Sequence, residues 1–145
     1  MDVNIRDLKE SDRNTVIDMM RAFYASDAVY TNGSEEIFSS DIDACLSDSP
    51  YLIGYVFEVE NKIAGYAMLS KSFSTEFGKP CVWIEDIFVL PEFRGRGTGK
   101  YFFKFIETAF VGSIFRLEVE KENINAIDLY EKAGFDFLPY LEMKK

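Results

Sequence analysis

The sequence predicts an α/β protein, with α+β character, in which a mixed central sheet of about six to seven strands carries helices on both faces. Three observations favour this class. Short apolar runs with the alternation of strands are interleaved with segments that repeat apolar residues at helical spacing. A glycine-rich turn joins an apolar strand directly to a helix. The 145 residues are 48% hydrophobic and 28% charged, so the chain 1–145 is expected to form a single domain.

The first fifty residues predict a strand followed by two helices. Val3 and Ile5 alternate with polar neighbours, as in a short strand. Ser11 is placed to cap the first helix, whose apolar face holds Val16, Ile17, Met19, Met20 and Phe23. A second helix is expected from Ser34 or Ser40 to Leu46, because Pro50 disfavours helical geometry in the residue before it.

The middle of the chain predicts three strands. Residues 51–59 and 63–70 are rich in aromatic and β-branched residues, and the polar stretch 60–62 joins them, so they should form an antiparallel hairpin. The third strand, 82–90, is apolar apart from Glu85 and Asp86, as expected of a strand covered on both faces. Two carboxylates inside such a strand require an explanation.

The last third predicts a helix, a strand, a helix and one or two final strands. The first of these helices follows the glycine turn and buries Phe102, Phe103, Phe105, Ile106 and Phe110. A fifth strand covers 115–119, and a short helix covers 123–132 and ends at Gly134. Alternation over 135–143 predicts the final strand or strands.

Composition narrows the partners and the compartment. A net charge of −9 with no histidine argues against nucleic acid or an anionic membrane, since both are bound largely by lysine and arginine. Cys45 and Cys81 lie in apolar surroundings without metal-ligand spacing, so free thiols in a reducing compartment and no bound metal are expected. No targeting segment or membrane span is seen, and we expect a cytoplasmic protein.

The turn from Arg94 to Lys100 is typical of a phosphate site. Gly95, Gly97 and Gly99 leave the backbone N–H groups accessible at the start of a helix, and Arg94, Arg96 and Lys100 add positive charge around Thr98. Its spacing excludes a Walker A loop and the dinucleotide-binding fingerprint. A glycine-rich connection without a ligand is the alternative interpretation.

Two motifs together resemble the GNAT (GCN5-related N-acetyltransferase) superfamily. The first is Arg94-x-x-Gly97-x-Gly99, and the second is Asn123-x-x-Ala126-x-x-x-Tyr130-x-x-x-Gly134-Phe135, which resembles the superfamily's C-terminal motif. The local sequence 83–89 is similar to the diamine and polyamine acetyltransferase branch. The resemblance implies acetyl-CoA in a V-shaped split between two parallel strands, 82–90 and 115–119.

The resemblance also implies where acetyl-CoA binds. The pantetheine arm would pair with the backbone of Phe88 and Val89 and contact Asn123. The pyrophosphate would be held by the amides of Arg96, Gly97, Gly99 and Lys100, with Arg94 supporting the turn. A backbone N–H near Ile87 or Phe88 is expected to polarise the thioester carbonyl.

Two side chains are candidate catalytic residues. Tyr130 matches the superfamily tyrosine that is proposed to protonate the departing thiolate. Glu85 is the candidate base, because desolvation inside an apolar strand raises the pKa of a carboxyl group toward a useful range; a substrate-ammonium anchor and a structural carboxylate are the alternatives. Asp86 should point to the opposite face unless the strand is bulged. Asp86 is therefore a second-rank candidate for substrate binding, and the role expected first is to bind backbone amides or a neighbouring side chain.

The acceptor is expected to be a small cationic amine such as a polyamine. Acidic residues, without lysine or arginine, occupy the segment between Asp27 and Pro50, although a solvated acidic face would look the same. Tyr24 and Tyr30 are candidate acceptor-binding residues. A protein lysine or N-terminus, an aminoglycoside-type amine, and a non-catalytic acyl-CoA sensor are alternatives. Relatives are frequently homodimers, and the segment 135–143 could pair across a subunit boundary.

Overall fold

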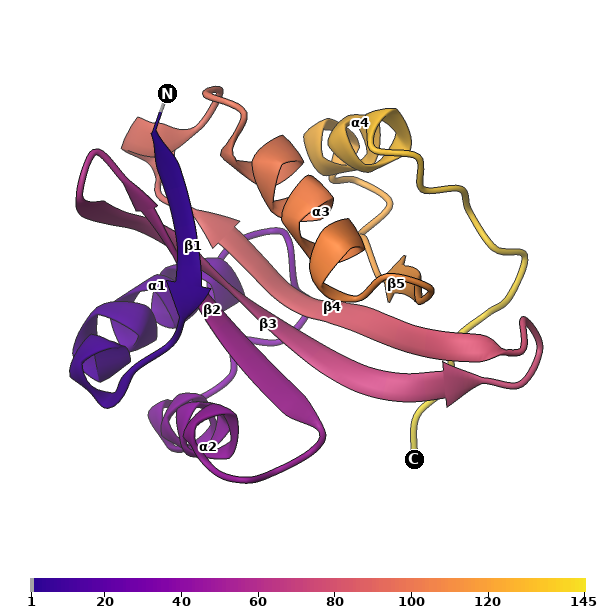
Figure 1. Ribbon diagram of the computed structural model, residues 1–145, viewed down its shortest axis with the longest axis horizontal. Coiled ribbons are helices and arrows are strands. Elements are labelled where there is room, and N and C mark those ends of the chain that lie inside the picture. Colours follow the sequence, from indigo (N-terminus) through magenta and orange to yellow (C-terminus); the bar gives the residue numbers. More distant parts are fainter. Residues whose placement is uncertain (1) are drawn as a thin grey trace.

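A mixed sheet organises the computed structural model, which describes residues 2–145 (Figure 1). Within these residues the sheet has five strands, in the spatial order β1 (Val3–Asp7), β2 (Leu52–Val59), β3 (Lys62–Ser74), β4 (Lys79–Val89) and β5 (Ile114–Leu117). Neighbouring strands are antiparallel except β4 and β5, which are parallel. The predicted fold class is confirmed, whereas the strand number is lower than the six to seven expected.

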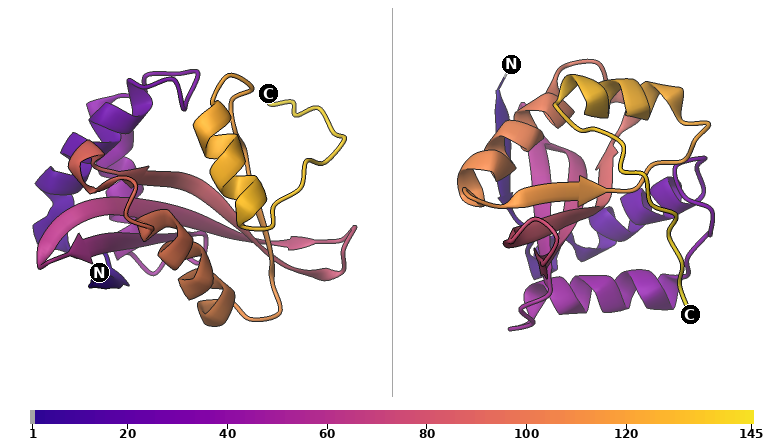
Figure 2. Two further views of the ribbon diagram at one scale, coloured as in Figure 1. Left: turned by 90° about the horizontal axis from the view of Figure 1, so that it is seen from above. Right: turned by 90° about the vertical axis from the view of Figure 1, so that its right-hand side faces the viewer.

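Helices cover both faces of the sheet, as the sequence predicts (Figure 2). The helices are α1 (Arg13–Tyr24), α2 (Glu35–Leu46), α3 (Thr98–Ala109) and α4 (Ile124–Lys132), with short 3-10 turns η1 (Glu10–Asp12) and η2 (Pro91–Phe93). Strand alternation divides the core between the faces. Val56, Tyr66 and Met68 pack with α1 and α2, whereas the intervening residues Phe57, Ala67 and Leu69 belong to the cluster that contains Phe102 and Ile106 of α3.

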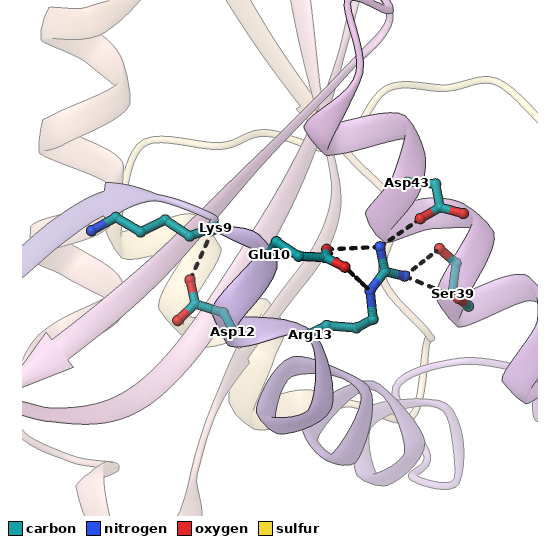
Figure 3. A network of polar contacts seen from close by, with 6 residues as sticks. All are labelled: Lys9, Glu10, Asp12, Arg13, Ser39 and Asp43. Atoms are coloured by element: carbon teal, nitrogen blue, oxygen red, sulfur yellow. Dashed lines mark hydrogen bonds and ion pairs between the residues drawn. The ribbon is translucent and has the colours of Figure 1, made fainter.

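The start of α1 differs from the prediction that Ser11 caps this helix. Ser11 lies inside η1, and α1 begins at Arg13. Asp12, the last residue of η1, joins η1 to α1. Its carboxylate accepts bonds from the Lys9 backbone N–H at 2.8 Å and from two nitrogens of Arg6. Figure 3 shows the neighbouring contacts, in which Arg13 reaches α2 at Ser39 and Asp43. These bonds fix α1 against both the sheet and α2.

Local turn chemistry accounts for two other boundaries. Ser34 caps α2, because its hydroxyl accepts a bond from the Ile37 N–H at 3.2 Å, so the earlier of the two predicted starts is confirmed. The β2–β3 hairpin turns through Glu60 and Asn61, whose φ angles of 54° and 63° are left-handed. Such paired positive φ angles match the right-handed twist of the flanking strands.

The predicted final strand or strands over 135–143 do not form. The segment after α4 has no strand assignment, and Pro139 removes one backbone donor from it. Apolar side chains near its end are exposed to solvent: Leu141 is 96% exposed and Met143 is 93% exposed. This segment accounts for the missing strands. No helix within residues 2–145 is long and apolar enough to span a membrane.

Candidate functional site

The parallel strands β4 and β5 separate partway along their length. Their pairing runs from Cys81 with Ile114 to Ile84 with Leu117 and stops there, because β5 ends while β4 continues to Val89. The β5-facing edge of 85–89 therefore has no strand partner within residues 2–145. The predicted opening between these strands is present, although β5 lies at the edge of the sheet.

The glycine turn leads into the same region from β4. Gly95 and Gly97 have φ angles of +75° and +81°, values that a residue with a Cβ adopts only with strain. A Cβ at either position would meet no atom within 4 Å, so the backbone conformation alone explains these two glycines. Gly99 differs, because it is helical and a Cβ there would lie 3.4 Å from Leu129.

The first turn of α3 presents donors suited to an anion. Gly97 is its N-cap and supplies no capping side chain, which leaves the first backbone N–H groups of the helix for an external acceptor. The side chains of Arg96 and Lys100 are not buried and add positive charge at this end. Within residues 2–145, the hydroxyl of Thr98 is a buried side-chain oxygen without a hydrogen-bond partner.

Arg94 holds the turn to the end of β4. Its Nε donates to the Val89 carbonyl oxygen at 2.7 Å, and its guanidinium lies 5.4 Å from the centre of the Phe88 ring. These contacts join the glycine turn to the last residues of β4. They also place Phe88 and Val89, the residues expected to pair with the pantetheine arm, directly beside the glycine turn.

A small pocket between the ends of β4 and β5 contains Tyr130. It is lined by Phe23, Ala28, Ile84, Glu85, Ile87, Leu117, Glu118, Val119, Asn123 and Tyr130. Asn123 caps α4 through a 3.3 Å bond to the Ala126 N–H, and α4 carries Tyr130 against Phe103 and Phe135. Burial raises the pKa of Tyr130 above its ordinary value, so the hydroxyl keeps its proton at neutral pH.

Glu85 is the extra residue of a β-bulge in β4. Met68 of β3 pairs with Asp86, and the next residue, Leu69, pairs with Ile84, so Glu85 has no counterpart. Because of the bulge, Glu85 and Asp86 line the same pocket, the second pocket of the site. A regular strand would point these two side chains to opposite faces. The bulge that the sequence interpretation required is present.

The two carboxylates have different surroundings. Glu85 is exposed, so the expectation that the strand desolvates it is wrong; the bulge leaves it outside the packed layers. Its Oε2 accepts a 2.7 Å bond from the Ser70 hydroxyl. Asp86 is the buried carboxylate, with 3% of its surface exposed.

Two tyrosine hydroxyls hold Asp86. Tyr24 donates to Oδ1 at 2.9 Å, and Tyr66 donates to Oδ2 at 2.8 Å. Burial raises the pKa of Asp86 to about 6, although both hydrogen bonds oppose this shift. Asp86 therefore binds neighbouring side chains, which was one of its two predicted roles. Tyr66 was not identified from the sequence, because the reach of its hydroxyl to Asp86 depends on the register of β3 against β4.

The second pocket has a volume of about 300 Å³ and a negative lining. Its walls are Tyr24, Asp41, Tyr51, Leu52, Met68, Ser70, Glu85 and Asp86, without lysine or arginine. Burial and the charge of Glu85 raise the pKa of Asp41, a residue that the sequence analysis placed only in a general acidic segment. Tyr24 lines this pocket, whereas Tyr30 is 75% exposed and lines neither pocket.

Comparisons with known proteins show what the chain is similar to. The sequence profile of the acetyltransferase (GNAT) family matches residues 17–135. Thialysine N-epsilon-acetyltransferase of Sus scrofa is 30% identical to the chain, over 91% of the chain and 83% of that protein. The Bos taurus protein of the same name is also 30% identical, over the same shares of both chains.

Solved structures are similar in fold over the whole chain. A "possible acetyltransferase" from Clostridium difficile 630 superposes with a TM-score of 0.82 at 24% identity and covers 99% of this chain and 96% of its own. AAC(6')-Iy, in complex with the bisubstrate analog CoA-S-monomethyl-acetylneamine, has a TM-score of 0.79 at 18% identity. That match covers 100% of this chain and 98% of AAC(6')-Iy. At these identities the two structures establish the shared fold.

Proposed function

The chain belongs to the GNAT acetyltransferase family, and from that premise we propose that it transfers an acetyl group from acetyl-CoA to a small cationic amine such as a polyamine. Family membership makes the chain an acetyl-CoA-dependent N-acetyltransferase. The acceptor and the roles of individual residues are the proposed parts. The proposal of a cationic acceptor rests on one observation: the pocket of about 300 Å³ is lined by carboxylates and by no lysine or arginine.

We propose that the glycine turn binds the pyrophosphate of acetyl-CoA, the cosubstrate that supplies the acetyl thioester. The uncapped start of α3 offers backbone N–H donors, with Arg96 and Lys100 beside them, and this donor set fits a pyrophosphate. Arg94 keeps the turn against β4 through its 2.7 Å bond to Val89. The β5-facing edge at Phe88 and Val89 has no strand partner within residues 2–145, which supports pairing with an extended arm there, and Asn123 lines the pocket beside Ile87.

Proton transfer is assigned to Glu85 and Tyr130. Both side chains line the pocket at the strand opening. The acceptor enters as an ammonium, and Glu85 takes its proton, directly or through water, before the nitrogen forms the amide bond. As the carbon–sulfur bond breaks, Tyr130 donates its hydroxyl proton to the thiolate, and the second proton that the nitrogen loses on becoming an amide returns to the Tyr130 oxygen, directly or through water. A backbone N–H near Ile87 or Phe88 would polarise the carbonyl during this exchange.

The acceptor pocket favours a cation because its negative charge is uncompensated. Asp41 and Asp86 both have raised pKa values, chiefly through burial, which means that their ionised forms are costly in the free protein. A bound ammonium would offset that cost. Glu85 lines this pocket and the Tyr130 pocket alike, so an amine anchored by Asp41 and Asp86 would extend toward the reaction centre.

The proposal is tested by release of CoA thiol from acetyl-CoA with a panel of amines. Diamines and polyamines should be acetylated with higher kcat/KM than aminoglycosides or lysine-containing peptides. Binding of acetyl-CoA without turnover on every amine would contradict the enzymatic proposal. An acetyl-CoA co-crystal soaked with the best amine would then show whether it occupies the pocket of Asp41 and Asp86.

We also propose that the enzyme acts in the cytoplasm as a homodimer. The exposed apolar side chains of the terminal segment, among them Phe137 and Leu141, support a subunit contact. Light scattering after size-exclusion chromatography distinguishes a dimer from a monomer of 16.7 kDa.

A further inference from the structure

Tyr66 of β3 does not line the acceptor pocket, but it bonds to a residue that does. Its side chain is fully buried, and its ring packs against those of Phe23 and Phe88, with centres 6.5 Å and 6.3 Å away. Its hydroxyl donates a 2.8 Å hydrogen bond to Oδ2 of Asp86. A hydroxyl buried among apolar rings is costly unless it is paired, so this bond holds the phenol and the carboxylate together.

Asp86 receives one hydroxyl donor on each of its two oxygens. Tyr24 donates to Oδ1 at 2.9 Å, and Tyr66 donates to Oδ2. An ionised carboxylate only accepts hydrogen bonds and has about four lone-pair sites, whereas a protonated carboxyl group uses one oxygen to carry its own O–H. The two tyrosines therefore favour the ionised form of Asp86, and they leave lone pairs of the carboxylate available to a ligand in the pocket.

The surroundings of Asp86 supply no positive charge. The titratable groups near it come from four elements and are Tyr24 of α1, Asp41 and Cys45 of α2, Tyr66 of β3 and Glu85 of β4. None of these groups is a cation. Of the ion pairs within residues 2–145, none includes Asp41, Glu85 or Asp86.

Other carboxylates of α2 are neutralised by arginines of α1. Arg13 pairs with Asp43 at 2.6 Å, and Arg21 pairs with Glu35. Asp41 lines the acceptor pocket instead. The uncompensated carboxylates of this region thus lie where the ammonium group of an acceptor can reach them.

We propose that Tyr66 is a positioning residue for the acceptor, because its bond keeps Asp86 as the carboxylate that binds the distal ammonium of a diamine. The inference rests on the proposed acetylation of a small cationic amine. The nitrogen to be acetylated lies at Glu85 and Tyr130, and the distal ammonium lies between Asp86 and Asp41, in the adjoining pocket. Tyr66 contacts neither nitrogen and acts through Asp86.

Two acceptors of equal length isolate the distal ammonium. Cadaverine carries it and pentylamine lacks it, whereas the titration of Glu85 and of the reacting nitrogen affects both amines alike. The ratio of kcat/KM for cadaverine to kcat/KM for pentylamine should therefore follow the ionisation of Asp86, whose pKa is about 6. In wild-type enzyme this ratio should rise as pH increases through about 6.

Tyr66→Phe removes a donor that favours the charged form of Asp86, so the rise should move up by about one pH unit. At pH 6.5 the ratio should be about a third of the wild-type value, and at pH 8.5 the two enzymes should agree within about 1.5-fold. Tyr24→Phe removes the other donor and should move the rise in the same direction. Asp86→Asn should give a low ratio without this rise, and adding Tyr66→Phe to it should change nothing further.

Tyr55→Phe is the matched control, because Tyr55 is a buried tyrosine in the cluster beneath α3 and should leave the ratio unchanged at every pH. If Tyr66→Phe lowers the ratio by the same factor at every pH, its role is structural and the inference is overturned. An unchanged profile overturns it as well. In both cases the wild-type preference for cadaverine leaves the proposed function intact. If wild-type enzyme acetylates no amine, or cadaverine no better than pentylamine, the proposed cationic acceptor itself fails.

Discussion

The hydroxyl of Ser70 on β3 donates a 2.7 Å hydrogen bond to Oε2 of Glu85, the bulged residue of β4. The carboxylate has no counterpart in the strand pairing, so this bond orients a side chain that packing leaves exposed. A base must lie within hydrogen-bonding reach of the proton it removes, and its orientation therefore affects turnover.

Ser70→Ala should lower kcat about three- to tenfold through loss of this orientation, while Glu85→Gln should lower it by about a hundredfold through loss of the base. Steady-state kinetics at saturating acetyl-CoA measures both. Ser70→Thr keeps the hydroxyl and serves as the control. A Glu85→Gln enzyme with wild-type kcat would leave Glu85 as an anchor or a structural carboxylate.

Tyr130→Phe should lower kcat by about a hundredfold and leave the Kd of acetyl-CoA within about twofold, because only the proton donor to the thiolate is removed. The ring packing against Phe103 and Phe135 survives the substitution. Turnover assays and calorimetric titration provide the two numbers. Tyr101→Phe, at an exposed position on α3, is the control. Losses of equal size in turnover and in binding would refute the assignment.

Gly97→Ala should weaken acetyl-CoA binding and also lower the free energy of unfolding by about 1 kcal/mol, since its φ of +81° strains any residue with a Cβ. Gly112→Ala is a matched control, because its φ is +85°, a Cβ there also meets open space, and it lies at the opposite end of α3. We expect a similar stability loss in the control and unchanged binding. Equal weakening of binding in both variants would show that the glycine turn has no special part in it.

Asp86→Asn should change how stability depends on pH. The pKa of Asp86 is raised from 3.8 to about 6 on folding, so the folded state binds the proton more tightly than the unfolded state. The contribution of this group to the free energy of unfolding therefore falls as pH rises from about 4 to 6 and is constant above. The variant should gain roughly 1 to 3 kcal/mol relative to wild type at pH 7.5, and this gain should vanish near pH 4.

Urea unfolding of both proteins between pH 4 and pH 8 measures that difference. Asp128→Asn, on the exposed side of α4, controls for the loss of one carboxylate at the surface. If the stability difference between the two proteins is the same at every pH, the raised pKa of Asp86 is not its cause. The variant should also lose kcat/KM for cationic amines, because the pocket loses a negative charge.

Much of the fold could be predicted because it follows from local sequence patterns. Helical spacing located α1, and the serine at position 34 marked the start of α2. The bulge at Glu85 could not be located, because every residue near it except Asp86 is apolar and either register buries apolar side chains. The terminal segment alternates like a strand, yet its lack of pairing depends on distant surfaces and on Pro139.

The candidate site was likewise predictable only in part. Spacing identified the turn from Arg94 to Lys100 and led to Tyr130, since both lie in contiguous motifs. Asp41 of α2 and Ser70 of β3 line the acceptor pocket, and Tyr66 of β3 holds Asp86 in its wall. Only the packing of α2 and the register of β3 against β4 bring these residues together.

The bulge also exchanges the two faces of β4. Before it, Val82 and Ile84 belong to the core beneath α3; after it, the even-numbered Phe88 belongs to the core of α1 and α2. Without Glu85, Ile84 and Asp86 would be consecutive, and regular alternation would keep them opposite Leu69 and Met68 with every following side chain in its present layer. The pairing of β3 with β4 therefore needs no residue at position 85, and the inserted residue serves instead to present a carboxylate at the edge of the acceptor pocket.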